Sequence, residues 1–138
     1  MIVYFDSSVL VAYYTVEERT DEAKSVVEQA ELPVISDLCI AELNVVIRRK
    51  QRQGFLSDTA TAAVFELFDE HVRDIFVRVA LDDGHLEATR QLPIHAEPPL
   101  RTLDALHLAV AVDVGGAIAT FDDRLAEASR SLGVEVLC

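Results

Sequence analysis

The stretch IVYFDSSVLVAYY, at residues 2–14, decides the fold. Its first four residues predict a buried strand, and SVLVAYY predicts a short helix directly behind it. Asp6 stands at the junction between the two. A carboxylate at such a junction can cap the helix, because its oxygens accept backbone N–H groups, or it can bind a metal ion. Since its position leaves both interpretations open, the other acids of the chain have to decide between them.

Short apolar runs alternate with amphipathic runs along the rest of the chain. Strands are expected at 33–36, 75–80, 117–120 and 134–137, and helices at 20–30, 37–54, 57–72, 82–92, 101–116 and 122–133. Strands that alternate with helices favour a parallel sheet covered on both faces. We therefore expect an α/β/α sandwich with a short, mostly parallel central sheet, formed as a single domain over residues 1–138. Pro93, Pro98 and Pro99 predict an irregular segment.

Composition narrows the class of protein. Hydrophobic residues make up 51% of the chain, which is too apolar for a disordered protein, yet no apolar run is long enough to span a membrane. The N-terminus lacks signal-peptide features, and Cys39 and Cys138 have no metal-type spacing, so we expect a cytoplasmic protein. The net charge of −12 argues against nucleic-acid binding. However, RRKQRQ at 48–53 is basic, and divalent cations could neutralise clustered acids.

Acids follow several predicted strands, at the edge where parallel α/β sheets bind ligands. These acids are Asp6, Asp37, Asp82, Asp83, Asp122 and Asp123, while Glu42 and Asp104 lie inside apolar helix segments. Each has a structural alternative as a helix cap or as a partner of the helix dipole. Asp37, for example, can cap the next helix, and Thr120 can form a capping box with Asp123.

Glu42 has the weakest structural alternative. Its neighbours in CIAELNVV are mostly apolar, and no Lys or Arg stands one turn away. Because burying an unpaired carboxylate is costly, Glu42 either faces solvent or needs a cation or hydrogen-bond donors. Clustered carboxylates without a His or Cys framework favour Mg²⁺ or Mn²⁺ over Zn²⁺, and such ions suit phosphoryl chemistry.

Four segments, in this order and at these distances, resemble the PIN domain family, and more narrowly the toxin ribonucleases of VapBC toxin–antitoxin pairs. They are IVYFDSSVLVAYY (2–14), ISDLCIAELNVV (35–46), RTLDALHLAVA (101–111) and ATFDDRLAEA (119–128). LDALHLA followed by TFDDRL is the most specific part, and the resemblance covers essentially the whole chain. It implies a PIN-like fold and an Mg²⁺- or Mn²⁺-dependent endoribonuclease that acts as the toxin of such a pair.

The resemblance also implies roles for individual residues and for partners. The catalytic and metal-binding acids would be Asp6, Glu42, Asp104 and Asp122, with Asp123 able to share or replace the last. Ser8 and Thr120 match supporting hydroxyl residues. Candidates for contacts to the RNA backbone are Arg48, Arg49, Lys50, Arg52 and Arg101, although basic residues at a helix end also stabilise its dipole.

The implied partners are a cognate VapB-type antitoxin, an RNA substrate and a second copy in a homodimer, with no membrane. The apolar helices at 8–14 and 39–47 could form a groove for a partner or be ordinary core.

Two other interpretations stay open. A Mg²⁺-dependent phosphatase or phosphoacceptor domain also places an acid at a strand end. A haloacid-dehalogenase-like phosphatase, however, has a second Asp where this chain has Ser8, and a receiver domain needs a late Lys, for which Lys24 and Lys50 are badly placed. The chain could also be a catalytically inactive PIN-like scaffold whose acids are caps. His107 is expected to be a packed core residue and is assigned no ligand role.

Overall fold

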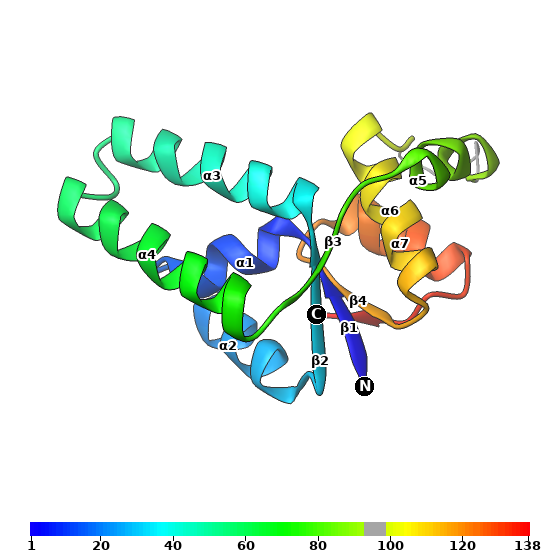
Figure 1. The fold of residues 1–138 in the computed structure, drawn as a ribbon, viewed down its shortest axis with the longest axis horizontal. Coiled ribbons are helices and arrows are strands. Elements are labelled where there is room, and N and C mark those ends of the chain that lie inside the picture. Colours follow the sequence, from blue (N-terminus) through cyan, green and yellow to red (C-terminus); the bar gives the residue numbers. More distant parts are fainter. Residues whose placement is uncertain (93–98) are drawn as a thin grey trace.

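A five-stranded parallel sheet forms the centre of the computed structural model, which describes residues 1–92 and 99–138 (Figure 1). Its strands are β1 (Ile2–Phe5), β2 (Leu32–Ser36), β3 (Val77–Val79), β4 (Ala117–Ala119) and β5 (Val136–Leu137). Their order across the sheet is β3-β2-β1-β4-β5, and every neighbouring pair is parallel. The N-terminal strand therefore lies in the middle, and its carboxyl end is flanked by those of β2 and β4.

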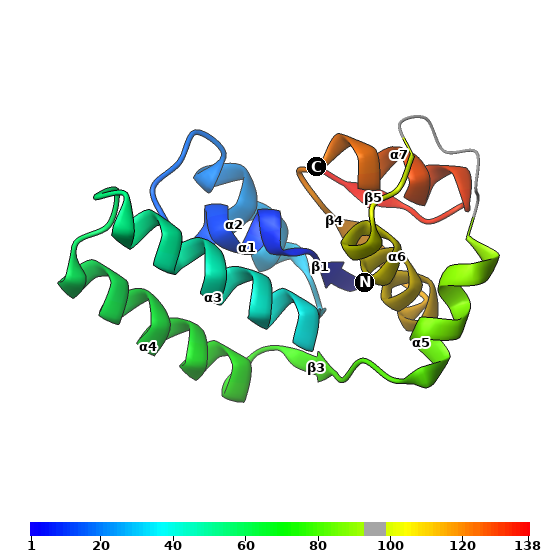
Figure 2. The same cartoon turned by 90° about the horizontal axis from the view of Figure 1, so that it is seen from above.

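Helices cover both faces of this sheet, as expected for an α/β/α sandwich (Figures 1 and 2). One face carries α1 (Ser7–Tyr14), α2 (Thr20–Gln29), α3 (Asp37–Arg52) and α4 (Asp58–Asp74). The other carries α5 (Asp83–Ala88), the 3-10 helix η1 (Thr89–Gln91), α6 (Thr102–Val114) and α7 (Asp123–Ser131). Right-handed crossovers explain this division, because the chain first moves from β1 to β3 and then returns in the opposite direction to β4 and β5.

The central strand is buried on both faces. Tyr4 and Phe5 are fully buried, and Leu10, Leu43 and Leu108 pack in the same core from helices on the two faces. This burial explains why the strand is a continuous apolar run instead of an alternating one.

Two glycines allow the chain to pass from α6 into β4 beside β1. Gly115 ends α6 in the left-handed conformation, with a φ of 75°, which glycine adopts without steric cost. A Cβ on Gly116 would lie 2.3 Å from the carbonyl oxygen of Ile2, so only glycine permits this approach. The sequence GG therefore permits the close approach that brings the start of β4 beside the central strand.

Some expected boundaries and caps were wrong. The strand expected at 75–80 covers only Val77–Val79. Ser36 caps α3 in place of Asp37, which forms an ion pair with Arg78. The strand expected at 134–137 covers only Val136–Leu137, and the helix expected at 82–92 is divided into α5 and η1. Most of the proline-rich segment, 93–98, lies outside the described residues.

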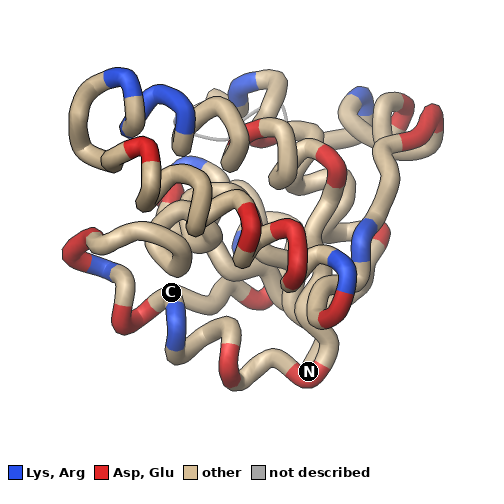
Figure 3. The backbone as a smooth tube through the Cα atoms, turned by 60° about the vertical axis from the view of Figure 1, so that its left-hand side comes forward, with Lys and Arg blue, Asp and Glu red and all other residues tan. Residues whose placement is uncertain are grey.

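Charge is unevenly distributed over the fold. Figure 3 shows Lys and Arg gathered around the turn between α3 and α4, whereas Asp and Glu are spread over many elements. Within residues 1–92 and 99–138, no helix has the length and apolar character needed to cross a bilayer.

Candidate functional site

Asp6 lies at the carboxyl end of the central strand and caps α1. Its Oδ1 accepts the Ser8 backbone N–H at 3.0 Å, the Ser8 hydroxyl at 2.5 Å and the Val9 N–H at 3.4 Å. Its Oδ2 accepts the Thr120 hydroxyl at 2.6 Å. Only 4% of Asp6 is exposed, and this burial raises its pKa. The hydrogen bonds from Ser8 and Thr120, and the nearby charge of His107, offset part of that rise.

The two hydroxyl residues connect Asp6 to the segment after β4. The Ser8 hydroxyl accepts the Phe121 N–H at 2.9 Å, and the Thr120 hydroxyl accepts the Asp122 N–H at 3.0 Å. Both side chains therefore link the first acid to the start of α7. These are the contacts that a supporting role for Ser8 and Thr120 would require.

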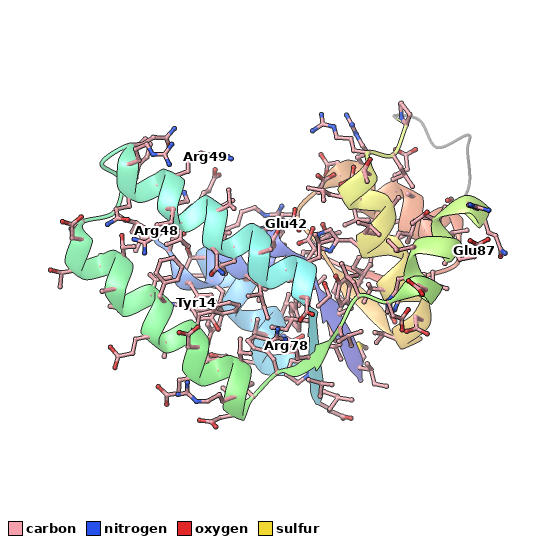
Figure 4. All side chains as sticks on the ribbon, turned by 45° about the horizontal axis from the view of Figure 1, so that its top comes forward. Tyr14, Glu42, Arg48, Arg49, Arg78 and Glu87 are labelled. Carbon is pink, nitrogen blue, oxygen red and sulfur yellow. The ribbon has the colours of Figure 1, made fainter. Side chains whose placement is uncertain are left out.

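Glu42 is bound by His107, a partner that sequence reasoning did not identify. The Glu42 Oε1 accepts a hydrogen bond from His107 Nε2, although 65 positions separate the residues. Glu42 comes from α3 and His107 from α6, so this contact joins the two helical layers. Figure 4 places Glu42 near the sheet end of α3, with Arg48 and Arg49 near its far end.

His107 continues into a buried polar network. Its Nδ1 lies 2.7 Å from the hydroxyl of Tyr4, which also contacts Ser36 Oγ at 2.9 Å and Cys39 Sγ at 3.3 Å. Burial lowers the pKa of His107, but its contacts with Cys39 and Glu42 outweigh this effect and raise the pKa to about 10. Burial also raises the pKa of Tyr4 well above its usual value, so its hydroxyl stays protonated. His107 is thus a core residue, as expected, but one with polar partners on both ring nitrogens.

The remaining acids line a shallow depression of about 340 Å³ at the same end of the sheet. Its lining residues are Arg101, Asp104, Asp122, Asp123 and Arg124. Asp104 accepts the Arg101 N–H at 3.2 Å, within the first turn of α6. Asp122 caps α7 by accepting the N–H groups of Arg124 and Leu125 at 2.9 and 3.1 Å, so the expected capping box of Thr120 with Asp123 was wrong.

The donor chemistry of this edge fits a hard divalent cation, because the acids supply oxygen ligands and Asp6 is a buried carboxylate. In the described part of the chain, however, no three side chains from His, Cys, Asp and Glu stand close enough to hold an ion. Glu42, Asp104 and Asp122 each contact a protein donor. The acids share one end of the sheet, but in this arrangement they do not form a complete ligand set.

Arg48 and Arg49 of the basic run lie toward the opposite end of α3 from Glu42 (Figure 4). The guanidinium of Arg48 lies 5.0 Å from the centre of the Phe65 ring, and Lys50 pairs with Glu17 at 3.1 Å. Arg101 does lie at the depression, and so does Arg124, which sequence reasoning missed. The sequence did not single out Arg124, which directly follows two acids. Its position at the depression depends on how α7 packs against α6.

A second hollow, of about 540 Å³, adjoins Asp6 through Ser8. It is lined by Ser7, Ser8, Val11, Glu17, Glu18, Arg19, Val46 and Phe121. The Arg19 guanidinium lies 3.7 Å from the centre of the Phe121 ring. Val11 and Val46 contribute to this hollow from the two apolar helices noted in the sequence, while Leu10 and Leu43 of the same helices are core.

Known proteins provide an independent line of evidence. The sequence model of the PIN domain matches residues 3–131. Ribonuclease VapC46 of Mycobacterium tuberculosis is 29% identical over 140 residues, which cover 98% of this chain and 95% of that protein. Among solved structures, FitAcB from Neisseria gonorrhoeae superposes with a TM-score of 0.75 at 16% identity, covering 100% of this chain and 97% of that one.

VapBC2 from Rickettsia felis, solved bound to a DNA fragment from its promoter, superposes with a TM-score of 0.69 at 12% identity and covers 99% of this chain and 97% of that one. The two structural matches show that the fold is shared. The family model spans nearly all of the sequence, from the central strand to the end of α7. The chain therefore belongs to the PIN domain family.

Proposed function

We propose that this chain is an Mg²⁺- or Mn²⁺-dependent endoribonuclease, the toxin of a toxin–antitoxin pair, acting in the cytoplasm as a single PIN domain over residues 1–138. Membership of the PIN family supports this assignment, as does a similarity along almost the full length of a protein named as a ribonuclease. The observation that carries the proposal is the buried Asp6 carboxylate, at the end of the central strand and tied through Thr120 to the segment that holds Asp122.

Several acids would bind the ion together. Asp6 is the central ligand, since its position is fixed by four hydrogen bonds from the chain. Glu42, Asp104 and Asp122 complete the set from α3, α6 and the start of α7, with Asp123 able to replace Asp122. A bound Mg²⁺ or Mn²⁺ would supply an activated water and shield the negative charge of a phosphodiester.

The rest of the site orients the substrate and the ligands. Ser8 and Thr120 hold Asp6 so that both of its oxygens keep a fixed direction. Arg101 and Arg124 flank the acids and can pair with phosphates on either side of the cleaved bond. These two arginines attract phosphate groups to the depression, although the net charge of the chain is −12. The basic run Arg48, Arg49, Lys50 and Arg52 could grip RNA that extends beyond the site.

A toxin of this kind needs a partner that blocks it. We propose a VapB-type antitoxin, whose segment would occupy the hollow lined by Val11, Val46 and Phe121 beside Asp6. The structural match to VapBC2, which is a complex, supports a partner of this class. A homodimer is also proposed, from the family resemblance.

Cleavage by a matched pair of variants tests the function. The purified chain is incubated with total cellular RNA in Mn²⁺ or in EDTA, and the ends are mapped. We expect cuts that leave 5′ phosphate and 3′ hydroxyl ends, lost in EDTA and in Asp6→Asn. Asp69→Asn, at an exposed carboxylate on α4, should cut like the wild type. Equal cutting by both variants would refute the assignment of Asp6.

The same preparation separates the alternatives. A scaffold whose acids serve only as caps would neither cut RNA nor bind Mn²⁺. A phosphatase or phosphoacceptor domain would instead hydrolyse p-nitrophenyl phosphate or take up phosphate from acetyl phosphate at Asp6. Either result would replace the ribonuclease proposal.

A further inference from the structure

A buried polar network joins the three segments that carry Asp6, Glu42 and Asp104. We infer that His107, held by Tyr4, is a positioning residue that fixes the Glu42 carboxylate at the end of the sheet and so strengthens binding of the metal ion. The inference rests on the proposed function, because it takes Glu42 to be one of the ligands.

The geometry of the network leaves His107 little freedom. The imidazole is 3% exposed and Tyr4 is fully buried. A carboxylate can only accept a hydrogen bond here, so Nε2 carries the hydrogen and donates to Glu42 Oε1. The other ring nitrogen is 2.7 Å from the Tyr4 hydroxyl. Because both nitrogens are engaged, the ring cannot rotate without losing a buried hydrogen bond.

Tyr4 is in turn fixed by α3. Its hydroxyl contacts Ser36 at 2.9 Å and Cys39 at 3.3 Å, and the Cys39 thiol donates to the Phe5 carbonyl oxygen at 3.0 Å. All buried polar side-chain atoms in the described residues have a hydrogen-bond partner. A fully satisfied network of this kind holds one arrangement, because any displacement would leave a buried polar group unpaired.

The members of the network stand close to the acids along the chain. Tyr4, on β1, precedes Asp6 by two residues. Cys39 precedes Glu42 by one turn on α3, and His107 follows Asp104 by one turn on α6. The network therefore fixes the three acid-bearing segments relative to one another. Groups this deep in the core do not touch the RNA, so their effect reaches the site through Glu42.

One carboxylate oxygen of Glu42 is used by His107, and the other has no hydrogen bond to the described residues. The inference takes this second oxygen to be the one that contacts the ion. Partners that orient metal-binding side chains commonly change metal affinity by about 10–100-fold when removed. We therefore expect loss of the His107 contact to weaken metal binding even though no ligand is removed.

The test measures Mn²⁺ affinity directly, by calorimetry on the purified full chain without RNA. Tyr4→Phe removes one hydroxyl and keeps the ring in the core, and His107→Leu removes the donor to Glu42. We expect the dissociation constant for Mn²⁺ to rise several-fold in the first and about tenfold or more in the second. In a Glu42→Gln background, His107→Leu should cause no further loss, because its effect passes through Glu42.

A matched control lies outside this network. Tyr14 and His71 form the same kind of contact, hydroxyl to Nδ1 at 2.7 Å, between α1 and α4. Tyr14→Phe removes a hydroxyl of the same kind, so it should lose stability much as Tyr4→Phe does while keeping the Mn²⁺ affinity of the wild type. The comparison separates positioning from a general loss of packing.

Each of the following outcomes would overturn the inference. Unchanged Mn²⁺ affinity in both Tyr4→Phe and His107→Leu would mean that Glu42 needs no support. A higher affinity in His107→Leu would mean that His107 competes with the ion for the carboxylate. If the wild type binds no Mn²⁺ and cuts no RNA, the proposed function fails and the inference fails with it. If Asp6 is essential but the network variants behave like the wild type, only the inference fails.

Discussion

The hydroxyl of Thr120 donates to Oδ2 of Asp6 over 2.6 Å, although 114 positions separate the two residues. The contact spans neighbouring strands, since Phe5 and Ala119 are register partners in the β1–β4 pair. Each residue follows its strand directly, so strand pairing alone brings them together. The first acid and the last acidic segment of the sequence are thus coupled by the backbone register of the sheet.

Replacing Thr120 tests this coupling. Thr120→Val keeps the shape of the side chain but removes the donor to Asp6 and the acceptor for the Asp122 N–H. We expect a loss of about 1–3 kcal/mol in the free energy of unfolding and a marked loss of cleavage. Thr120→Ser restores the hydroxyl and should recover most of both. Denaturant unfolding and an RNA cleavage assay give the two readouts, and a Val variant as stable and active as the wild type would contradict the prediction.

Asp6→Asn should stabilise the chain when no divalent ion is present. A buried carboxylate carries a desolvation cost that an amide of the same shape avoids, and the Asn oxygen can still accept from Ser8. We expect a gain of about 1–2 kcal/mol in EDTA. Mn²⁺ should raise the melting temperature of the wild type and leave that of the variant unchanged. Thermal melts with and without Mn²⁺ measure both, and equal Mn²⁺ shifts in the two proteins would argue against Asp6 as a ligand.

Arg101 and Arg124 should matter more for RNA than the basic run on α3. They line the depression with the acids, whereas Arg48 and Arg49 lie near the far end of that helix. We expect Arg101→Ala and Arg124→Ala each to raise KM and to reduce the slope of log affinity against log salt by about 1. The double variant Arg48→Ala/Arg49→Ala is the comparison, with little change expected. If the double variant on α3 had larger effects than the variants at the depression, the RNA would have to bind along α3 instead.

Gly116→Ala should prevent correct folding. The added Cβ would lie 2.3 Å from the Ile2 carbonyl oxygen, which is backbone and cannot move aside without breaking the β1–β4 register. Gly84→Ala is the matched control, because its Cβ would meet only the Asp82 side chain at 3.1 Å. Circular dichroism and the yield of folded protein report the result. If Gly116→Ala melted like the wild type, the close packing described for this strand pair would be wrong.

The sequence predicted the order of strands and helices because each short apolar run was bounded by a clear helix start. Asp6 could be placed at a strand end from its immediate neighbours alone. Caps were harder to predict. In each of the pairs Ser36/Asp37 and Thr120/Asp122, either side chain can accept a helix N–H. Which of them accepts the helix N–H depends on one or two backbone dihedral angles that the residue types do not determine.

The contact between Glu42 and His107 could not be predicted from either segment. Each residue stands in an apolar run. The residues around it do not indicate which side chain, 65 positions away, will be its hydrogen-bond partner. The pairing follows from the way α3 and α6 meet over the end of β1, which is a tertiary property. The lack of a nearby Lys or Arg beside Glu42 was the one signal that some distant group must bind it.

The central place of β1 has a consequence for synthesis on the ribosome. The strand is translated well before β4, one of its two neighbours in the sheet. Until β4 emerges, the Asp6 side chain lacks Thr120, and the acids of α6 and α7 cannot reach it. On the proposed function, the acids around Asp6 could therefore not form a complete site until β4 has paired with β1.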